Sequence, residues 1–91
     1  MGDRTATAHG VTARYVETDH ERRLMFESDD ARAVIAQNLD GYAMLSVREH
    51  EDGIELERYY GLEMALDHVG EMLGVDARQL PVPEVAADLG M

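Results

Sequence analysis

The sequence predicts a single α+β domain: a five-stranded antiparallel meander followed by a C-terminal helix packed on one sheet face, with a short terminal helix after it. Three observations predict this fold class. The chain has 91 residues, 45% of them apolar, which allows one modest core. Short segments alternate apolar and polar residues with a period of two, as strands do. One later segment repeats apolar residues every three or four positions, as an amphipathic helix does.

We expect residues 1–8 to form a flexible tail and residues 9–91 to form the domain. Val11, Ala13 and Tyr15 share one face of the first expected strand, and Met25 lies opposite its neighbours in the second. Asp40-Gly41 is the strongest hairpin signal, because a type I′ turn needs positive φ at both central positions. The strands are expected at about 9–17, 22–28, 31–37, 42–49 and 54–60.

The main helix is expected at 62–73, where one apolar stripe recurs. The stripe comprises Leu62, Ala65, Leu66, Val69, Met72 and Leu73. Gly74 suits the left-handed residue that ends many helices. Asp76 is expected to cap a short turn, and Pro83 to begin a terminal helix over 83–89.

A sheet of five strands is about 20–25 Å wide, because neighbouring strands lie ~4.8 Å apart. One helix with its side chains covers only about 10–12 Å of that width. The short terminal helix adds some cover. We therefore expect either a partner subunit on the rest of the sheet or a sheet that curls toward a barrel.

The composition is strongly acidic. The chain carries 19 acidic residues against eight arginines, with no lysine, for a net charge of −11 and a pI near 4.5. Such a surface is typical of proteins from salt-in halophiles, where concentrated salt screens the repulsion between carboxylates. A GC-rich genome also removes lysine, but it does not explain the excess of acid.

Several function classes lack the residues that they need. The absence of cysteine excludes disulfides and thiolate metal sites, and the four histidines lack metal-ligand spacing. We expect no cofactor and no catalytic residue, since no phosphate-binding glycine loop or nucleophile motif occurs. The N-terminus has no apolar signal region, and no apolar run approaches the ~20 residues of a membrane span. These absences predict a cytoplasmic protein without a membrane partner.

Two groups of residues are candidate sites. Glu63, Asp67 and Glu71 share a helical face, which we interpret as the solvated side of the helix rather than a cation site. The candidate ligand-binding residues are Tyr42, Arg48, Tyr59, Tyr60 and His68. Adjacent strand residues point to opposite faces, so one of Tyr59 and Tyr60 is expected under the helix and the other outside.

The runs RYYGLEMALDHVGEMLGV, NLDGYAMLSVR and LPVPEVAADLGM resemble a family of short uncharacterised haloarchaeal proteins. The resemblance covers nearly the whole chain. It implies no activity, substrate or site residue.

We interpret the chain as a non-enzymatic protein-interaction or homodimerisation module that uses the uncovered sheet face or an edge strand. Two alternatives stay open. One is a single-stranded nucleic-acid-binding protein that uses Tyr42, Arg48 and other arginines on the open face, although eight scattered arginines make no basic stripe. The other is a small-ligand or cation-binding protein with a pocket near Tyr59 and His68.

The charge predicts that the domain loses stability as salt is lowered. Repulsion among the excess carboxylates is screened when the Debye length is ~3 Å, near 1 M salt, and grows as the salt is diluted. Thermal melts across a series from multimolar to millimolar KCl measure the effect. A melting temperature that stays flat across the series would contradict the halophilic interpretation.

Overall fold

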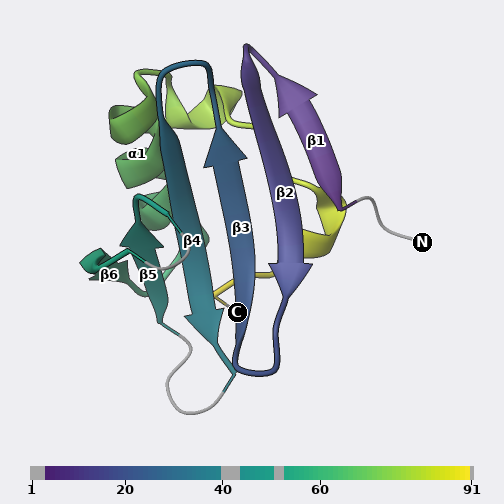
Figure 1. The fold of residues 1–91 in the computed structure, drawn as a ribbon, viewed down its shortest axis with the longest axis vertical. Coiled ribbons are helices and arrows are strands. Elements are labelled where there is room, and N and C mark those ends of the chain that lie inside the picture. The colour runs from purple at the N-terminus through teal and green to yellow at the C-terminus, as the bar shows by residue number, and fades with distance from the viewer. Residues whose placement is uncertain (1–3, 40–43, 51–52, 91) are drawn as a thin grey trace.

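The computed structural model describes residues 4–39, 44–50 and 53–90. It contains one antiparallel sheet, in which neighbours along the chain are also neighbours in space (Figure 1). The six strands are β1 (Thr5–Ala8), β2 (Val11–Glu17), β3 (Glu21–Glu27), β4 (Arg32–Asn38), β5 (Leu45–Arg48) and β6 (Glu55–Tyr59). Helix α1 (Leu62–Leu73) follows, and then two 3₁₀ helices, η1 (Ala77–Gln79) and η2 (Glu84–Ala86). The predicted α+β class and antiparallel meander are confirmed, but the sheet has six strands, not five.

The additional strand is β1, which occupies the second half of the segment 1–8 that we expected to be a flexible tail. His9 and Gly10 have φ angles of 53° and 78°, so they form a two-residue turn that returns the chain along β2. The register pairs Ala8 with Val11 and Ala6 with Ala13. The prediction failed because Thr-Ala-Thr-Ala carries no large apolar residue, so its alternation gives no hydrophobic signal.

The other boundaries lie within a few residues of the prediction, and α1 begins and ends as expected. Asp76 caps η1 by accepting a hydrogen bond from the backbone N–H of Arg78 at 2.9 Å. The expected helix over 83–89 is wrong, because only the single 3₁₀ turn η2 forms there. Ala86 and Leu89 are both buried, and 3₁₀ geometry places residues three apart on one side. The predicted turn at Asp40-Gly41 lies outside the described residues.

The core lies on one side of the sheet. The largest buried side chains of the strands are Val11, Tyr15, Leu24, Phe26, Ile35, Leu45 and Val47. Helix α1 packs over β4, β5 and β6 and contributes Ala65 and Val69 to this core. The period-two patterns of the sequence are therefore confirmed for β2 and β3, because Val11, Ala13 and Tyr15 lie on the side of the sheet that carries α1 and Met25 lies on the other.

The chain itself covers the part of this face that α1 leaves free. Leu80, Ala86 and Leu89 from the segment 75–90 belong to the same buried cluster. Figure 1 shows this segment on the same side of the sheet as α1. The expectation that a partner or a closed barrel must hide the rest of this face is therefore wrong. The sheet stays open, with β1 and β6 as its edges.

The return of the chain after α1 depends on Gly70. A Cβ atom at this helical position would lie 2.6 Å from the carbonyl oxygen of Val75 and 3.2 Å from the amide nitrogen of Ala77. The Val75 N–H also donates to the Gly70 carbonyl oxygen at 3.0 Å, and Gly74 ends the helix with a φ of 72°. This close approach turns the C-terminal segment back toward the sheet.

We predict that Gly70→Ala destabilises the domain by about 1–3 kcal/mol, because backbone atoms must move to admit the methyl group. Helix propensity alone predicts the opposite sign, since alanine is favoured over glycine by ~1 kcal/mol. Urea unfolding at fixed salt gives the free energy, and Glu71→Ala at the next, exposed position is the control. A Gly70→Ala variant as stable as the wild type would show that the backbone of residues 75–77 does not closely approach the helix at this position.

Candidate functional site

No described part of the chain packs on the second side of the sheet. We call this side the open face; it consists of the strand side chains that point away from α1. The strand registers place five of the eight arginines on it: Arg14, Arg23, Arg32, Arg48 and Arg58. Only three glutamates of the described strands share it: Glu21, Glu27 and Glu55. A chain with a net charge of −11 thus presents more arginine than acid on this face.

A row of directly opposed residues crosses the middle of the open face. It runs from Arg14 on β2 through Met25 on β3 and Val34 on β4 to Arg48 on β5. The centre of the row is apolar and its two ends are guanidinium groups. Val34 is only 3% exposed although no helix covers it, as expected where long arginine stems lie over apolar neighbours.

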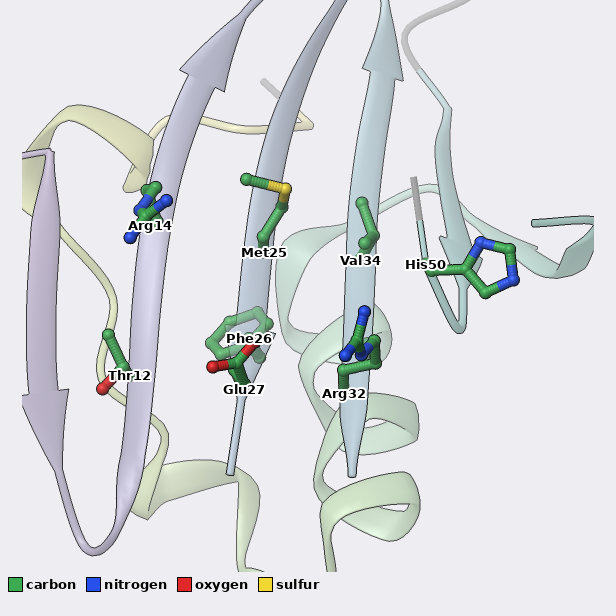
Figure 2. A pocket seen from close by; sticks show the side chains of 9 residues that line it. Thr12, Arg14, Met25, Phe26, Glu27, Arg32, Val34 and His50 are labelled. Atoms are coloured by element: carbon green, nitrogen blue, oxygen red, sulfur yellow. The ribbon is translucent and has the colours of Figure 1, made fainter. Parts of the chain in front are cut away.

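A shallow hollow of about 150 Å³ opens beside this row. Its floor includes Met25 and Val34, and Arg14 and Arg32 stand on either side (Figure 2). Glu27 also lines the hollow and is paired across the strands with Arg32. We call it the Arg14–Arg32 hollow. It combines an apolar floor, the guanidinium groups of Arg14 and Arg32, the carboxylate of Glu27 and the imidazole of His50.

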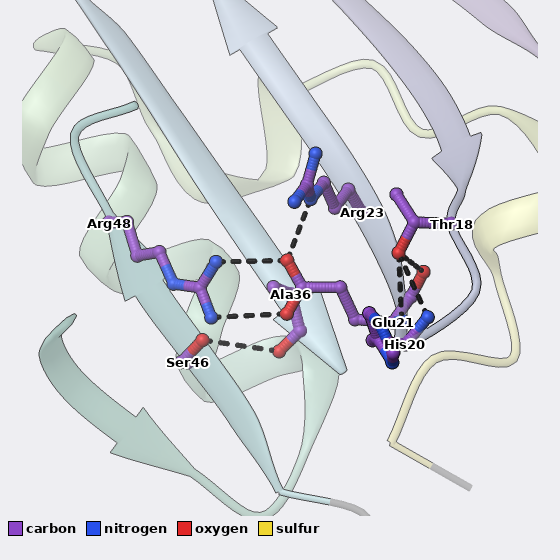
Figure 3. A network of polar contacts seen from close by, with 7 residues as sticks. All are labelled: Thr18, His20, Glu21, Arg23, Ala36, Ser46 and Arg48. Atoms are coloured by element: carbon purple, nitrogen blue, oxygen red, sulfur yellow. Dashed lines mark hydrogen bonds and ion pairs between the residues drawn. The ribbon is translucent and has the colours of Figure 1, made fainter. Parts of the chain in front are cut away.

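An ion-pair network occupies the other end of the open face (Figure 3). Glu21 accepts hydrogen bonds from Arg48 at 3.0 and 3.2 Å and from Arg23 at 2.7 Å. Partial burial alone would raise the pKa of Glu21, but the hydrogen bonds from Arg48 and Arg23 outweigh burial and hold that pKa below its ordinary value. The network fixes Arg48 across β3, β4 and β5.

Five of the eight arginines are bound to carboxylates. These pairs are Arg22–Asp88, Arg23–Glu21, Arg48–Glu21, Arg58–Glu55 and Arg78–Asp76.

Arg4 lies over the ring of Tyr15, with 5.8 Å between the guanidinium carbon and the ring centroid. Arg14 and Arg32 form no ion pair or side-chain hydrogen bond with any residue that the structure describes. Both guanidinium groups therefore line the hollow without a direct ion pair to a described residue, and Glu27 is a carboxylate that lines it with them.

A second polar contact lies on the helix side of the sheet. The Tyr59 hydroxyl and His68 Nδ1 are 3.1 Å apart, and the two rings meet edge to face with centroids 5.8 Å apart. Partial burial raises the pKa of Tyr59, and the carboxylates of Glu57, Glu71 and Asp67 raise it further. A buried histidine beside a carboxylate would favour a ligand pocket here. The partner that the structure shows for the half-buried His68 is instead the hydroxyl of Tyr59.

The predicted site residues do not form one cluster. Tyr59 and His68 meet between β6 and α1, whereas Arg48 lies on the open face within the Glu21 network. Tyr59 packs against the core and Tyr60 is 77% exposed, as strand alternation predicts. Tyr42 lies outside the described residues.

Sequence analysis did not predict the hollow, although the alternation of strand side chains between the two faces could have indicated it. Tyr15 and Phe26 belong to the core, so their neighbours Arg14 and Met25 must point to the other face.

The described residues form neither a metal site nor a membrane-spanning helix. Within residues 4–39, 44–50 and 53–90, no three His, Asp or Glu side chains are placed to hold a metal ion. Glu63, Asp67 and Glu71 are all exposed. Over the same residues, α1 is too short and too polar to cross a bilayer, and no longer helix is found.

Comparison with known proteins gives one match. A model for a family of unknown function (DUF7111) matches residues 5–91. The chain belongs to this family. The match begins at Thr5, the first residue of β1, which agrees with β1 being part of the domain. No curated protein and no solved structure matches the chain. The predicted resemblance to uncharacterised proteins is thus confirmed, while the haloarchaeal origin stays a prediction.

We predict that Glu21→Gln lowers the free energy of unfolding by about 1–2 kcal/mol at neutral pH, since it removes charge-assisted hydrogen bonds. The folded pKa of Glu21 lies below its unfolded value, so its ionised form stabilises the fold above the unfolded pKa. That stability is lost as pH falls through the folded pKa, so the difference from the wild type should shrink between about pH 6 and pH 3.

Urea unfolding at each pH measures the difference, with Glu63→Gln on the exposed helix face as the control. A constant difference down to pH 3 would show that the Glu21 charge does not stabilise the fold.

Proposed function

We propose that the domain is a non-enzymatic protein-binding module that docks a partner on its open face. The observation that carries this proposal is the placement of five of the eight arginines of an acidic chain around an apolar centre, on the sheet face that no described segment covers. An apolar centre with a charged rim, rich in arginine and methionine, is the usual composition of a protein interface. We further propose that the protein works in a cytoplasm of high salt.

The composition of the open face favours a protein over a single-stranded nucleic acid. Nucleic-acid platforms of this kind stack bases on aromatic rings. Among the described residues of β1–β6, the aromatic side chains are Tyr15, Phe26 and Tyr59, and all three lie on the helix side. Glu21, Glu27 and Glu55 would also repel a phosphate backbone. A protein partner needs no aromatic ring for base stacking, and its own cationic groups can pair with these glutamates.

The proposal concerns a surface, so its test must locate the contact. A photoreactive benzoylphenylalanine replaces Thr12, which is exposed on the open face, or Glu63, which is exposed on the outer face of α1. Each variant is irradiated in an extract of the source cells in multimolar KCl, once with and once without nuclease treatment. We expect a specific protein adduct from the Thr12 position and none from the Glu63 position.

Three results would contradict the proposal. Adducts of equal yield from both positions would show contact without a preferred face. An adduct that nuclease removes would identify a nucleic acid as the occupant. An adduct with the mass of two copies of the chain would make the open face a homodimer interface rather than a docking site for another protein.

A further inference from the structure

The Arg14–Arg32 hollow has the properties of an anchor site rather than of a flat contact. Its volume of about 150 Å³ gives room for one side chain of a partner, and the hollow is open to solvent. Its floor presents Met25, beside the nearly buried Val34, and methionine adapts its shape to an apolar guest. One apolar side chain of a partner therefore fits the floor.

The guanidinium groups of Arg14 and Arg32, on the two sides of the hollow, favour a partner that carries acidic residues on both sides of such a side chain. In this acidic chain, Arg14 and Arg32 remain without a carboxylate partner among the described residues, whereas five other arginines are paired. Arg14 on β2 and Arg32 on β4 are separated by one intervening strand, β3. Arg32 is also offset by two residues along the strand direction from Val34, which lies in line with Arg14. Their Cα atoms are separated by roughly 12 Å on standard sheet spacing.

An extended peptide matches that spacing. Side chains at positions i−2, i and i+2 share one face of an extended chain, and the outer two are about 13 Å apart. A carboxylate at each outer position then meets one guanidinium, and the central side chain meets the floor. Charge-assisted bonds from arginine to carboxylate are the strong ones, which gives this arrangement its specificity.

We propose that the hollow binds an extended partner segment of the pattern acid-x-apolar-x-acid, with the apolar side chain on Met25 and the carboxylates on Arg14 and Arg32. This proposal rests on the proposed function and names the chemistry of its partner. Glu27 lines the same hollow and repels a carboxylate brought to Arg32. It limits the affinity of the site, and its removal should strengthen binding.

The test uses synthetic peptides and the full chain. The probe is the capped peptide Glu-Ser-Phe-Ser-Glu, and the matched probes are Gln-Ser-Phe-Ser-Gln and Glu-Ser-Ser-Ser-Glu. Titrations are followed by NMR of methyl-labelled methionines, at the lowest salt at which the domain stays folded, because salt weakens the charge contacts. We expect the Glu-Ser-Phe-Ser-Glu probe to shift the Met25 methyl signal, and the two matched probes to bind at least several-fold more weakly.

Variants separate this site from general charge attraction. The double variant Arg14→Gln with Arg32→Gln should weaken binding of the probe by about tenfold or more. Glu27→Gln should strengthen it a few-fold, a gain that loss of folding cannot produce. Arg58→Gln, on the far edge of the same face, should leave the affinity unchanged. Unchanged spectra away from the hollow confirm that each variant is folded.

Several outcomes would overturn the proposal. They are equal binding of all three peptides, shifts confined to methionines other than Met25, and a Glu27→Gln variant that binds more weakly. If no peptide binds while the Thr12 crosslink to a partner persists, the proposed acid-x-apolar-x-acid pattern is wrong. The proposal that the open face binds a protein is then retained. If oligothymidylate shifts Met25 instead, and the Thr12 adduct is nuclease-sensitive, both proposals fail together.

Discussion

The close approach of the chain to Gly70 is the contact on which the rest of the structure depends. The segment after α1 can turn back only because no side chain separates the helix from the backbone at Val75 and Ala77. Once turned, residues 75–90 complete the cover of the same sheet side that α1 occupies. Hydrogen bonds at the end of this segment connect it to the sheet. Arg22 donates to Asp88 at 2.6 Å, and the Gly90 N–H donates to the Gln37 side chain. Among the described residues, all of the cover lies on one side, and no described segment packs on the other side of the sheet.

This one-sided cover explains the distribution of charge. A buried arginine is costly without a partner, so the strand arginines other than Arg22 point to the side that stays in contact with water. Two of them are fixed by Glu21, and Arg58 is bound to Glu55 at the β6 edge. Arg14 and Arg32 are left beside the apolar centre without a carboxylate among the described residues. The same packing arrangement therefore produces both the stable core and the surface to which we assign binding.

The sequence predicted the parts of this fold that depend on local pattern. Alternation placed Tyr15 and Phe26 in the core, and the three- and four-residue spacing placed α1 to the residue. It failed for β1, whose small side chains carry no hydrophobic pattern, and for residues 75–90, whose cover is built largely from irregular backbone. The contact between Tyr59 and His68 depends on packing, which no local pattern specifies. The placement of Arg14 and Arg32 around one hollow, without an ion pair to a described residue, depends on cross-strand register.

The central claim is that two guanidinium groups of the open face are available to a partner while the other strand arginines are engaged. Modification by an arginine-selective dicarbonyl reagent, read residue by residue by mass spectrometry, tests it most directly on the isolated protein. The account predicts that Arg14 and Arg32 react several-fold faster than Arg22, Arg23 and Arg48, whose side chains are largely buried and ion-paired. Equal rates at all five positions, or slow reaction at Arg14 and Arg32, would contradict it.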